Sequence, residues 1–401
     1  MTEILFLAHR IPFPPDRGDK IRSWHLLKRL CGLGRVHLAC FADDEADAAH
    51  LQSLRDAVGE SLGECYVEVR RTGRAVAAAR ALLERRPVSL AAFDSAAMRA
   101  FAERVTAERP VAAVFAFSGQ MAQFVPPGPR FVMDFVDVDS AKFEAYAESG
   151  PAALRWLMRR EAELLSAFER ATAARADASL FVSEAEAALF RARTRLPGVR
   201  AVSNGIDVDH YDPAAAFTRL SDGERGEGPL LLFTGQMDYR PNVEAVTAFA
   251  RDVLPHLPGV RFAVAGRRPA PEVVALRRDG VVVTGEVPDI RSWFAAADIV
   301  VAPLAIARGI QNKVLEAMAM ARPVVASPAA FEGIEAEPGL ELILASPHEQ
   351  AAAIAHLLAH PAKARAIGLA ARRRMEDHYR WEARLEPLAE IVFPPAQRAA
   401  A

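Results

Sequence analysis

Short apolar runs alternate with longer, alanine-rich stretches along most of the chain. Charged or glycine-containing loops follow the runs, which is the pattern of strands buried on both faces of a parallel sheet. We predict strands at residues 4–8, 36–41, 66–69, 111–117, 130–135, 179–182, 230–234, 262–265, 281–284 and 299–302. The intervening stretches, such as 21–30 and 152–175, have helical composition. The alternation predicts an α/β fold built on parallel sheets.

The length of 401 residues suits two domains of about 180 residues each. A polar, glycine-rich stretch, SDGERGEGP at 221–229, indicates a linker. The pattern of strand, glycine turn and helix occurs on both sides of it, so we expect two Rossmann-like domains. The predicted boundaries are a first domain at 1–205, a linker at 206–228, a second domain at 229–380 and a final helix at 381–395.

The charge balance and the cysteines exclude several classes of protein. The formal net charge is −2 and the isoelectric point is near 6.6, so we expect no nucleic-acid partner. Cys31, Cys40 and Cys65 form no CxxC pair, which argues against a disulfide framework or a zinc site. The first apolar run predicts a strand rather than a signal peptide, and no run is long enough to cross a bilayer. These features predict a cytoplasmic protein.

The most informative segment is 308–327 (RGIQNKVLEAMAMARPVVAS), which joins a glycine-containing loop to a short helix and an apolar strand. Lys313 and Glu316 are three residues apart, so a helix beginning near residue 310 places both on one face. The chain has 44 arginines and five lysines, and a lysine here indicates a need for a compact ammonium group. The alternative is a solvated ion pair on a surface helix.

The same segment has the features of an anion site. A helix N-terminus behind Gly309, flanked by Arg308 and Lys313, attracts negative charge through its unpaired N–H groups and its dipole. A carboxylate one turn into the helix does not suit a bare phosphate, but Glu316 can accept hydrogen bonds from the hydroxyls of a ribose. The combination predicts a nucleotide ligand.

The loop after the first strand, at 9–22 (HRIPFPPDRGDKIR), is charged and contains Gly18. Loops between a strand and a helix are where open α/β sheets bind ligands. Gly18 would allow a close backbone approach, and Lys20 or Arg22 would supply charge. The alternative is an exposed helix cap.

Three acidic residues, Asp134, Asp137 and Asp139, cluster at the C-terminal end of the fifth predicted strand. Such a cluster is able to bind a divalent metal. The alternative is that Asp139 or Ser140 caps the next helix.

Three predicted strands of the second half end at a glycine: Gly235, Gly266 and Gly285. Pro241 suits the first turn of a helix after Gly235. We expect each of these strand ends to face the cleft. Arg267, which directly follows Gly266, is explained by itself as a surface cation in a chain so rich in arginine.

Three stretches carry a family resemblance: VSNGIDVDHYDP at 202–213, and the segments 233–250 and 308–327. They resemble the retaining glycosyltransferases of family 4, which have the GT-B fold, and the closest likeness is to the sugar transferases associated with the exosortase (PEP-CTERM) system. The resemblance covers nearly the whole chain. It implies an acceptor-side domain and a nucleotide-sugar-binding domain facing an interdomain cleft, with the helix at 381–395 packing back onto the first domain.

The resemblance also implies roles for residues of the second domain. Glu316 matches the second of two family glutamates and would hold the ribose, whereas Arg308 stands in place of the first. Arg267 would lie near the nucleotide, and the backbone from Gly285 to Val287 would contact the base.

The departing diphosphate would be neutralised by Lys313, Arg308 and Arg240. Many relatives have an arginine and a lysine on the diphosphate where this chain has Gln236 and Asn242. We therefore expect Arg308, by itself or with Arg240, to restore cationic contact to the diphosphate. The double substitution Gln236→Arg with Asn242→Lys should recover part of the transition-state stabilisation that Arg308→Ala loses.

In the first domain, the resemblance implies that the loop with Gly18, Lys20 and Arg22 reaches the diphosphate and the acceptor. Asp137 is the nearest candidate for a place near the reacting sugar where the family often has a histidine. These enzymes usually work without a divalent metal, so we expect neither a metal nor another cofactor.

The function predicted is that of a glycosyltransferase (EC 2.4, hexosyltransferase type) that moves a sugar from a nucleotide diphosphate-sugar to a polysaccharide or lipid-linked acceptor, in exopolysaccharide biosynthesis. Two alternatives stay open. One is a GT-B nucleotide-sugar epimerase, and the other is a non-catalytic nucleotide-sugar-binding or scaffold protein.

Arginines are concentrated at 70–86 and recur in the predicted helix at 152–175. Basic faces on amphipathic helices allow two interpretations. One is a solvated face, and the other is peripheral contact with the inner membrane surface.

Overall fold

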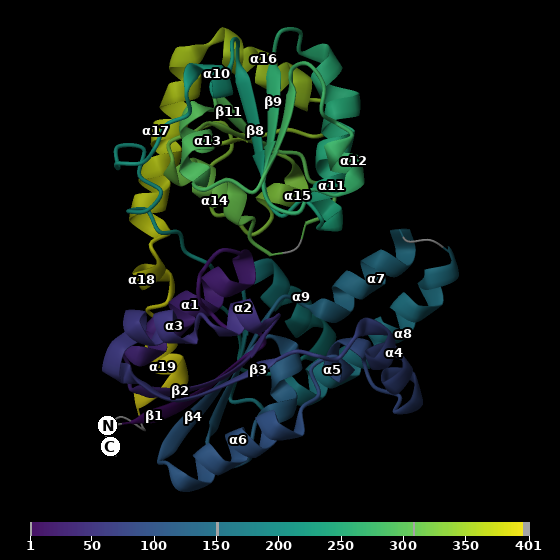
Figure 1. The fold of residues 1–401 in the computed structure, drawn as a ribbon, viewed down its shortest axis with the longest axis vertical. Helices are drawn as coiled ribbons and strands as arrows, with labels where there is room; N and C mark the ends of the chain where they lie inside the picture. The colour runs from purple at the N-terminus through teal and green to yellow at the C-terminus, as the bar shows by residue number, and fades with distance from the viewer. Residues whose placement is uncertain (1, 150–151, 308, 396–401) are drawn as a thin grey trace. The chain divides into compact units, whose positions relative to one another are not determined.

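The structure, a computed structural model, describes residues 2–149, 152–307 and 309–395. The chain divides into two compact units. Unit 1 is Met1–Ser203 with Leu385–Ala401, and unit 2 is Asn204–Arg384. Each unit is a parallel sheet with helices packed around it (Figure 1), so the predicted α/β architecture with two Rossmann-like sheets is confirmed.

The described part of unit 1 contains a seven-stranded sheet in the order β3-β2-β1-β4-β5-β6-β7, with parallel neighbours throughout. Its strands are β1 Glu3–Ala8, β2 Arg35–Ala42, β3 Leu62–Val69, β4 Val111–Phe117, β5 Arg130–Val136, β6 Ala178–Phe181 and β7 Val199–Ala201. The edge strand β7 was not predicted, because three residues are too few to show a period.

The helices of unit 1 connect these strands. They are α1 Gly18–Cys31, α2 Glu45–Ala48, α3 Leu51–Val58, α4 Arg74–Leu83, α5 Val88–Ala91, α6 Ala96–Glu108, α7 Asp139–Ser149, α8 Ala152–Arg175, α9 Glu184–Thr194 and α19 Leu388–Val392, with 3-10 turns at Gly59–Ser61 and Gly119–Phe124. Ser183 caps α9 by accepting a hydrogen bond from the Glu186 N–H, and the Glu186 carboxylate accepts one from the Val138 N–H at 2.7 Å. This side chain therefore ties the loop after β5 to α9.

The core of unit 1 includes an aromatic cluster of Phe135, Phe181 and Phe190. The ring centroids of Phe135 and Phe181 are 5.4 Å apart, and those of Phe181 and Phe190 are 4.8 Å apart. All three side chains are buried, and each contributes about 1.5–3 kcal/mol by burial. The cluster anchors β5 and β6 to α9.

The described part of unit 2 contains a six-stranded parallel sheet in the order β10-β9-β8-β11-β12-β13. Its strands are β8 Leu230–Thr234, β9 Arg261–Ala265, β10 Val281–Gly285, β11 Ile299–Ala302, β12 Val324–Ala326 and β13 Ile343–Leu344. Every residue of the central strand β8 is buried, which explains why it is apolar along its whole length. The edge strand β13 has two residues, which are too few to be predicted as a strand from the sequence pattern.

The helices of unit 2 follow the expected alternation. They are α10 Asp222–Arg225, α11 Arg240–Ala248, α12 Pro271–Val274, α13 Ile290–Ala296, α14 Asn312–Ala319, α15 Pro328–Phe331, α16 Gln350–Ala359, α17 Pro361–His378 and α18 Trp381–Arg384, with a π-helical turn at Phe249–Val253 and a 3-10 turn at Leu254–His256. Residues 206–228, expected as a linker, fall within unit 2. Arg372 of α17 holds them by donating to the carbonyl oxygens of Val208 and Tyr211 at 2.8 and 2.6 Å.

The single helix expected at 381–395 is wrong. Two short helices, α18 and α19, occupy this region, because Pro387 has no N–H to donate within a helix. The second of them belongs to unit 1, where Arg130 Nε donates to the Ile391 carbonyl at 3.0 Å. None of the helices that the structure describes has the length and hydropathy of a membrane span.

Candidate functional site

Glycines at the carboxyl ends of three neighbouring strands bring the backbone close together in unit 2. Gly235 follows β8, Gly266 follows β9, and Gly285 ends β10. A Cβ atom on Gly266 would lie 1.7 Å from the Gly235 carbonyl oxygen, so no other residue fits there. The main chains of the Gly235 and Gly266 turns are therefore in direct contact, and the edge of the sheet is lined by main chain at this point.

Lys313 projects from the first turn of α14 toward this edge. Its side chain is 8% exposed, and its Nζ donates to Asn242 Oδ1 at 2.7 Å. Nζ also lies 4.5 Å from the centroid of the Phe233 ring and would lie 3.4 Å from a Cβ atom on Gly235. Burial lowers the pKa of Lys313 to about 7, although the charge of Glu316 opposes the shift. An ammonium group is thus held beside the main chain of the Gly235 turn.

Glu316 lies one turn further along α14 and is half-buried. Burial raises its pKa to about 7, whereas the charge of Lys313 and a hydrogen bond from the Tyr211 hydroxyl oppose that rise. Burial of the phenol raises the pKa of Tyr211, and the charge of the Glu316 carboxylate adds to that effect. Lys313 and Glu316 are therefore electrostatically coupled on one helix, as the spacing predicted, and each has a partner from outside the helix.

The other predicted donor-binding residues of unit 2 have varied surroundings. The Arg267 carbonyl accepts from the Met237 N–H at 2.9 Å, so its backbone lies against the Gly235 turn. Val287 is half-buried just beyond β10, and Gly309, with φ of 62°, precedes α14. Arg240 is exposed and contacts Glu244 at 2.6 Å, which is one turn along α11. Arg308 lies outside the described residues.

Asn242 has a role that the sequence did not reveal. Its side chain accepts from Lys313 Nζ and donates to the Gln236 carbonyl at 2.9 Å, so it joins the Gly235 turn to α14. A lysine at position 242 would remove this acceptor and set a second ammonium group beside the first. The rescue expected from Gln236→Arg with Asn242→Lys stays a prediction, and it would have to offset the loss of the contact between Asn242 and Lys313.

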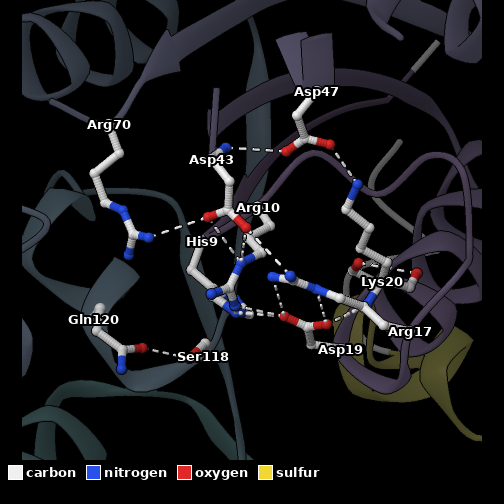
Figure 2. A network of polar contacts seen from close by, with 11 residues as sticks. His9, Arg10, Arg17, Asp19, Lys20, Asp43, Asp47, Arg70, Ser118 and Gln120 are labelled. Atoms are coloured by element: carbon white, nitrogen blue, oxygen red, sulfur yellow. Dashed lines mark hydrogen bonds and ion pairs between the residues drawn. The ribbon is translucent and has the colours of Figure 1, made fainter. Parts of the chain in front are cut away.

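Figure 2 shows a second polar network, which lies at the carboxyl ends of the strands in unit 1. Its centre is a pair of carboxylates, Asp19 and Asp43. Arg10 contacts Asp19 at 2.6 Å and Asp43 at 3.2 Å, and Arg17 contacts them at 2.9 and 3.2 Å. Arg70 contacts Asp43 at 3.1 Å. Three half-buried guanidinium groups thus share two carboxylates, which leaves an excess of positive charge at this edge.

The network favours the ionised form of the Asp19 carboxyl group. Burial by itself would raise its pKa, but hydrogen bonds and charge from His9 and Arg17 hold the pKa well below its ordinary value. His9 Nε2 lies 3.2 Å from Asp19 Oδ2. The carboxylate therefore fixes the loop after β1, and it remains an acceptor at any pH near neutrality.

Lys20 and Arg22, predicted to offer charge to a ligand, are instead buried ion-pair partners. Lys20 is 4% exposed and contacts Asp47 at 2.5 Å. Arg22 is 1% exposed and contacts Asp134, which is fully buried, at 2.8 Å. The structure corrects the prediction, since neither cation is displayed on the surface of unit 1. Gly18, by contrast, is exposed at the first position of α1.

Asp137 follows a strained residue at the end of β5. Val136 has φ of 72°, an unusual value for a β-branched residue, and its N–H donates to Asp134 Oδ1 at 3.0 Å. Burial and the charges of Glu186 and Asp139 raise the pKa of Asp137 to about 7. Its Oδ1 atom is buried without a hydrogen-bond partner. This carboxyl group is able to hold or release a proton near neutral pH.

The three aspartates do not form a metal site. Asp134 is engaged by Arg22 and by the Val136 N–H, and no group of three or more potential ligands occurs among the residues that the structure describes. Ser140 does not cap α7 through its side chain, since its hydroxyl donates to the buried Glu169 at 2.6 Å.

Comparison with known proteins supports a relationship to glycosyltransferases. Residues 228–360, within unit 2, match the family described as "Glycosyl transferases group 1". None of the curated proteins matches the chain. A similar solved structure is the sucrose-phosphate synthase from Thermosynechococcus elongatus, with a TM-score of 0.71, 19% identity and 100% of both chains covered.

Two further structures show the same fold. Anabaena HepE in complex with UDP-glucose has a TM-score of 0.68 and 17% identity, over 97% of this chain and 99% of that one. WaaG, a glycosyltransferase involved in lipopolysaccharide biosynthesis, has a TM-score of 0.68 and 18% identity, over 98% and 100%. The predicted GT-B fold is thus confirmed, and the similarity to the group 1 glycosyl transferases is confined to residues 228–360.

Proposed function

We propose that the protein is a retaining glycosyltransferase of family 4 that acts in the cytoplasm. It transfers a sugar from a nucleotide diphosphate-sugar to a polysaccharide or lipid-linked acceptor. The observation that carries the proposal is the coupled pair of Lys313 and Glu316 beside the glycine-lined sheet edge, within the segment that matches a glycosyltransferase family. A role in exopolysaccharide biosynthesis, with exosortase-associated relatives, rests on the sequence resemblance alone.

Lys313 and the main chain of the Gly235 turn would bind the diphosphate. The ammonium group is compact and desolvated, and Asn242 fixes its position, so little reorganisation is needed when negative charge develops on the leaving group. The N–H groups of Gly235 and Gly266 already donate to the carbonyl oxygens of Ala265 and Gly285, at 3.1 Å each, so the glycines would serve mainly by placing no side chain between Lys313 and a phosphate group. Glu316 would accept hydrogen bonds from the ribose, with Tyr211 holding its carboxylate in place.

Further donor contacts are proposed on the basis of the family resemblance. Arg267 would lie near the nucleotide, the backbone from Gly285 to Val287 would contact the base, and Arg240 and Arg308 would add positive charge. HepE was solved with UDP and with UDP-glucose, so uridine diphosphate-sugars are the first donors to test.

In unit 1 we propose the network around Asp19 and Asp43 as the acceptor side. Its arginines and carboxylates offer many donors and acceptors for sugar hydroxyls, and its excess positive charge suits an acceptor that carries phosphate. By the family resemblance Asp137 would lie near the reacting sugar, where its carboxyl group, with a pKa raised to about 7 by burial, would be able to exchange a proton. Gly18 would allow the backbone of the loop to approach the ligands.

The test combines binding with turnover. A thermal-shift screen of nucleotide sugars identifies the donor, because a ligand specific to the folded state raises the melting temperature. Free nucleoside diphosphate is then measured over time with a glycan or lipid extract as acceptor. Lys313→Met should abolish release, whereas Lys363→Met, at an exposed lysine of α17, should not.

The outcomes separate the candidate functions. An epimerase would convert the donor without releasing nucleoside diphosphate, and a binding protein would show a thermal shift without turnover. Retention is read from the anomeric configuration of the product by NMR. If none of the nucleotide sugars tested raised the melting temperature, the proposed function would be refuted.

A further inference from the structure

Exposed apolar side chains gather on two helices of unit 1. Ten large hydrophobic side chains are exposed in the described part of the chain, and five of these lie in α4 and the first turns of α8. Leu83 is 88% exposed and Trp156 is 66% exposed. We call this set the Leu83–Trp156 surface, and its members are Val76, Leu82, Leu83, Leu154 and Trp156.

Helix α4 is apolar on two sides. Ala77 and Ala81 are buried and attach the helix to unit 1. Val76 and Leu83 are seven residues apart, so they share a face, and both are exposed. A helix needs only one apolar stripe to pack on its own unit, so the second stripe indicates a contact with something outside the unit.

Helix α8 continues this surface. Arg160 Nη2 donates to the Ala81 carbonyl oxygen at 2.9 Å, and Figure 1 shows α4 and α8 side by side in unit 1. Trp156 is four residues before Arg160, so it lies on the same side of α8 and about 6 Å along the axis. Leu82 and Leu83 directly follow Ala81. The exposed side chains of the two helices therefore belong to one continuous surface.

Positive charge surrounds these apolar side chains. Residues 70–86 include six arginines and one glutamate, and residues 155–160 include three arginines and no acid. Arg85 and Arg159 are exposed at the two ends of this region. Arg80 and Arg86 form ion pairs with Glu84 and Asp94, and Arg70 pairs with Asp43, so the positive charge of this surface comes from exposed arginines such as Arg85 and Arg159.

We propose that the Leu83–Trp156 surface docks on a lipid bilayer that contains anionic lipids. The apolar side chains enter the boundary between headgroups and acyl chains, where tryptophan is favoured, while the arginines attract the headgroups. A nucleic acid would engage the arginines but would leave Leu83 and Val76 exposed. This proposal does not depend on the transfer reaction, because it needs neither a donor nor an acceptor.

The test uses the full chain and vesicles of two compositions, phosphatidylcholine alone and phosphatidylcholine with phosphatidylglycerol. The protein should sediment with the anionic vesicles and much less with the neutral ones. Trp156 supplies a spectroscopic signal, because Trp293 and Trp381 are buried and Trp24 is half-buried. Its emission should shift to the blue on binding, and lipids brominated near the headgroup should quench it.

Substitutions on and away from the Leu83–Trp156 surface test which part of the protein contacts the bilayer. Trp156→Ser and Leu83→Ser should each lower the partition coefficient by about tenfold or more, the effect of withdrawing one large apolar side chain from the bilayer. Arg159→Glu should lower it by roughly tenfold, since one cation is replaced by an anion. The matched controls are Leu369→Ser and Arg373→Glu, at exposed positions of α17 in unit 2, and they should bind like the wild type.

Several results would overturn the proposal. These are failure to sediment with anionic vesicles, equal partition into both vesicle types, and equal losses in the control variants. Self-association of the wild type through Leu83 and Trp156, seen by sedimentation velocity without vesicle binding, would assign the surface to a second copy instead. Because all substituted side chains are exposed, circular dichroism should show folded variants, and the fluorescence of the wild type tests the proposal without any substitution.

Discussion

The buried ion pair between Arg22 and Asp134 supports a quantitative prediction for Arg22→Met. Methionine keeps most of the length of the arginine side chain but leaves the Asp134 carboxyl group, which is fully buried, without its cation. Two guanidinium contacts, at 3.0 and 2.8 Å, are lost. Removing one partner of a buried pair costs about 3–5 kcal/mol, so unit 1 should lose that much of its free energy of unfolding.

The loss should depend on pH with a defined sign. Burial already raises the pKa of Asp134 above its ordinary value, and Arg22 opposes that rise. Without Arg22 the pKa rises further, so the folded state binds a proton that the unfolded state releases as the pH exceeds the ordinary value for aspartate. Stability of the variant relative to the wild type should therefore fall as the pH increases, and the deficit should be larger at pH 8 than at pH 5.

Urea unfolding of the full chain at both pH values measures the loss, and hydrogen exchange of β5 peptides assigns the transition to unit 1. The double variant Arg22→Met with Asp134→Leu should recover most of the stability, because no charge is then left buried. Arg251→Met is the control, since Arg251 and its partner Asp252 are exposed. A loss below about 1 kcal/mol would refute a structural role for Arg22, and a loss that is equal at the two pH values would refute the protonation of Asp134 in the variant.

Three further predictions concern the proposed donor site. Glu316→Gln should weaken UDP binding by about 1–3 kcal/mol in calorimetry at pH 8, where the wild-type carboxyl group is ionised, while Glu272→Gln at an exposed position of α12 should not. An unchanged affinity would take Glu316 out of the site. Binding of UDP at pH 8 should be accompanied by proton uptake, because the diphosphate raises the pKa of Lys313. Binding at pH 6 should be accompanied by proton release, because the ribose favours the ionised form of Glu316. Calorimetry in buffers of different ionisation enthalpy measures both signs, and no proton exchange at either pH would contradict the coupling. Transfer should persist in EDTA, because Lys313 supplies positive charge for the diphosphate, and a strict requirement for added Mg²⁺ or Mn²⁺ would disprove this.

The sheets could be predicted from the sequence because their order follows from local patterns. A strand such as β8 is buried on both faces, so it is apolar throughout and ends at a glycine where the chain turns. The pairing of Lys313 with Glu316 could likewise be predicted from the sequence, since both residues lie on one short helix. Edge strands of two or three residues carry no such period, and β7 and β13 were missed for that reason.

The partners of buried charges could not be predicted, because they come from distant parts of the chain. Lys20 pairs with Asp47, 27 residues away, and Arg22 with Asp134, 112 residues away. A charged loop with a glycine looks the same whether its cations face solvent or a buried carboxylate. Asn242 was interpreted as a missing lysine for the same reason, since its contact with Lys313 spans 71 residues.

The return of α19 to unit 1 has a consequence for the order in which the protein can mature on the ribosome. Unit 2 is formed by one uninterrupted segment, Asn204–Arg384, whereas unit 1 needs residues from both sides of that segment. Arg130 and Arg29 of unit 1 donate to the carbonyl oxygens of Ile391 and Leu385, and Leu388 and Val392 are buried there. The half that is synthesised first is therefore the half that is completed last.

Until α19 leaves the ribosome tunnel, the nascent unit 1 exposes the apolar surface that α19 later covers. All strands of unit 2 have been synthesised by then, so unit 2 can fold before unit 1 is complete. A nascent chain that ends at Arg384, with a stalling sequence long enough to bring Arg384 out of the tunnel, should accordingly protect unit 2 from protease while β5 of unit 1 remains cleavable. Folding of unit 1 is thus completed only when the last residues of the chain emerge, although its first strand is the first part of the chain to be synthesised.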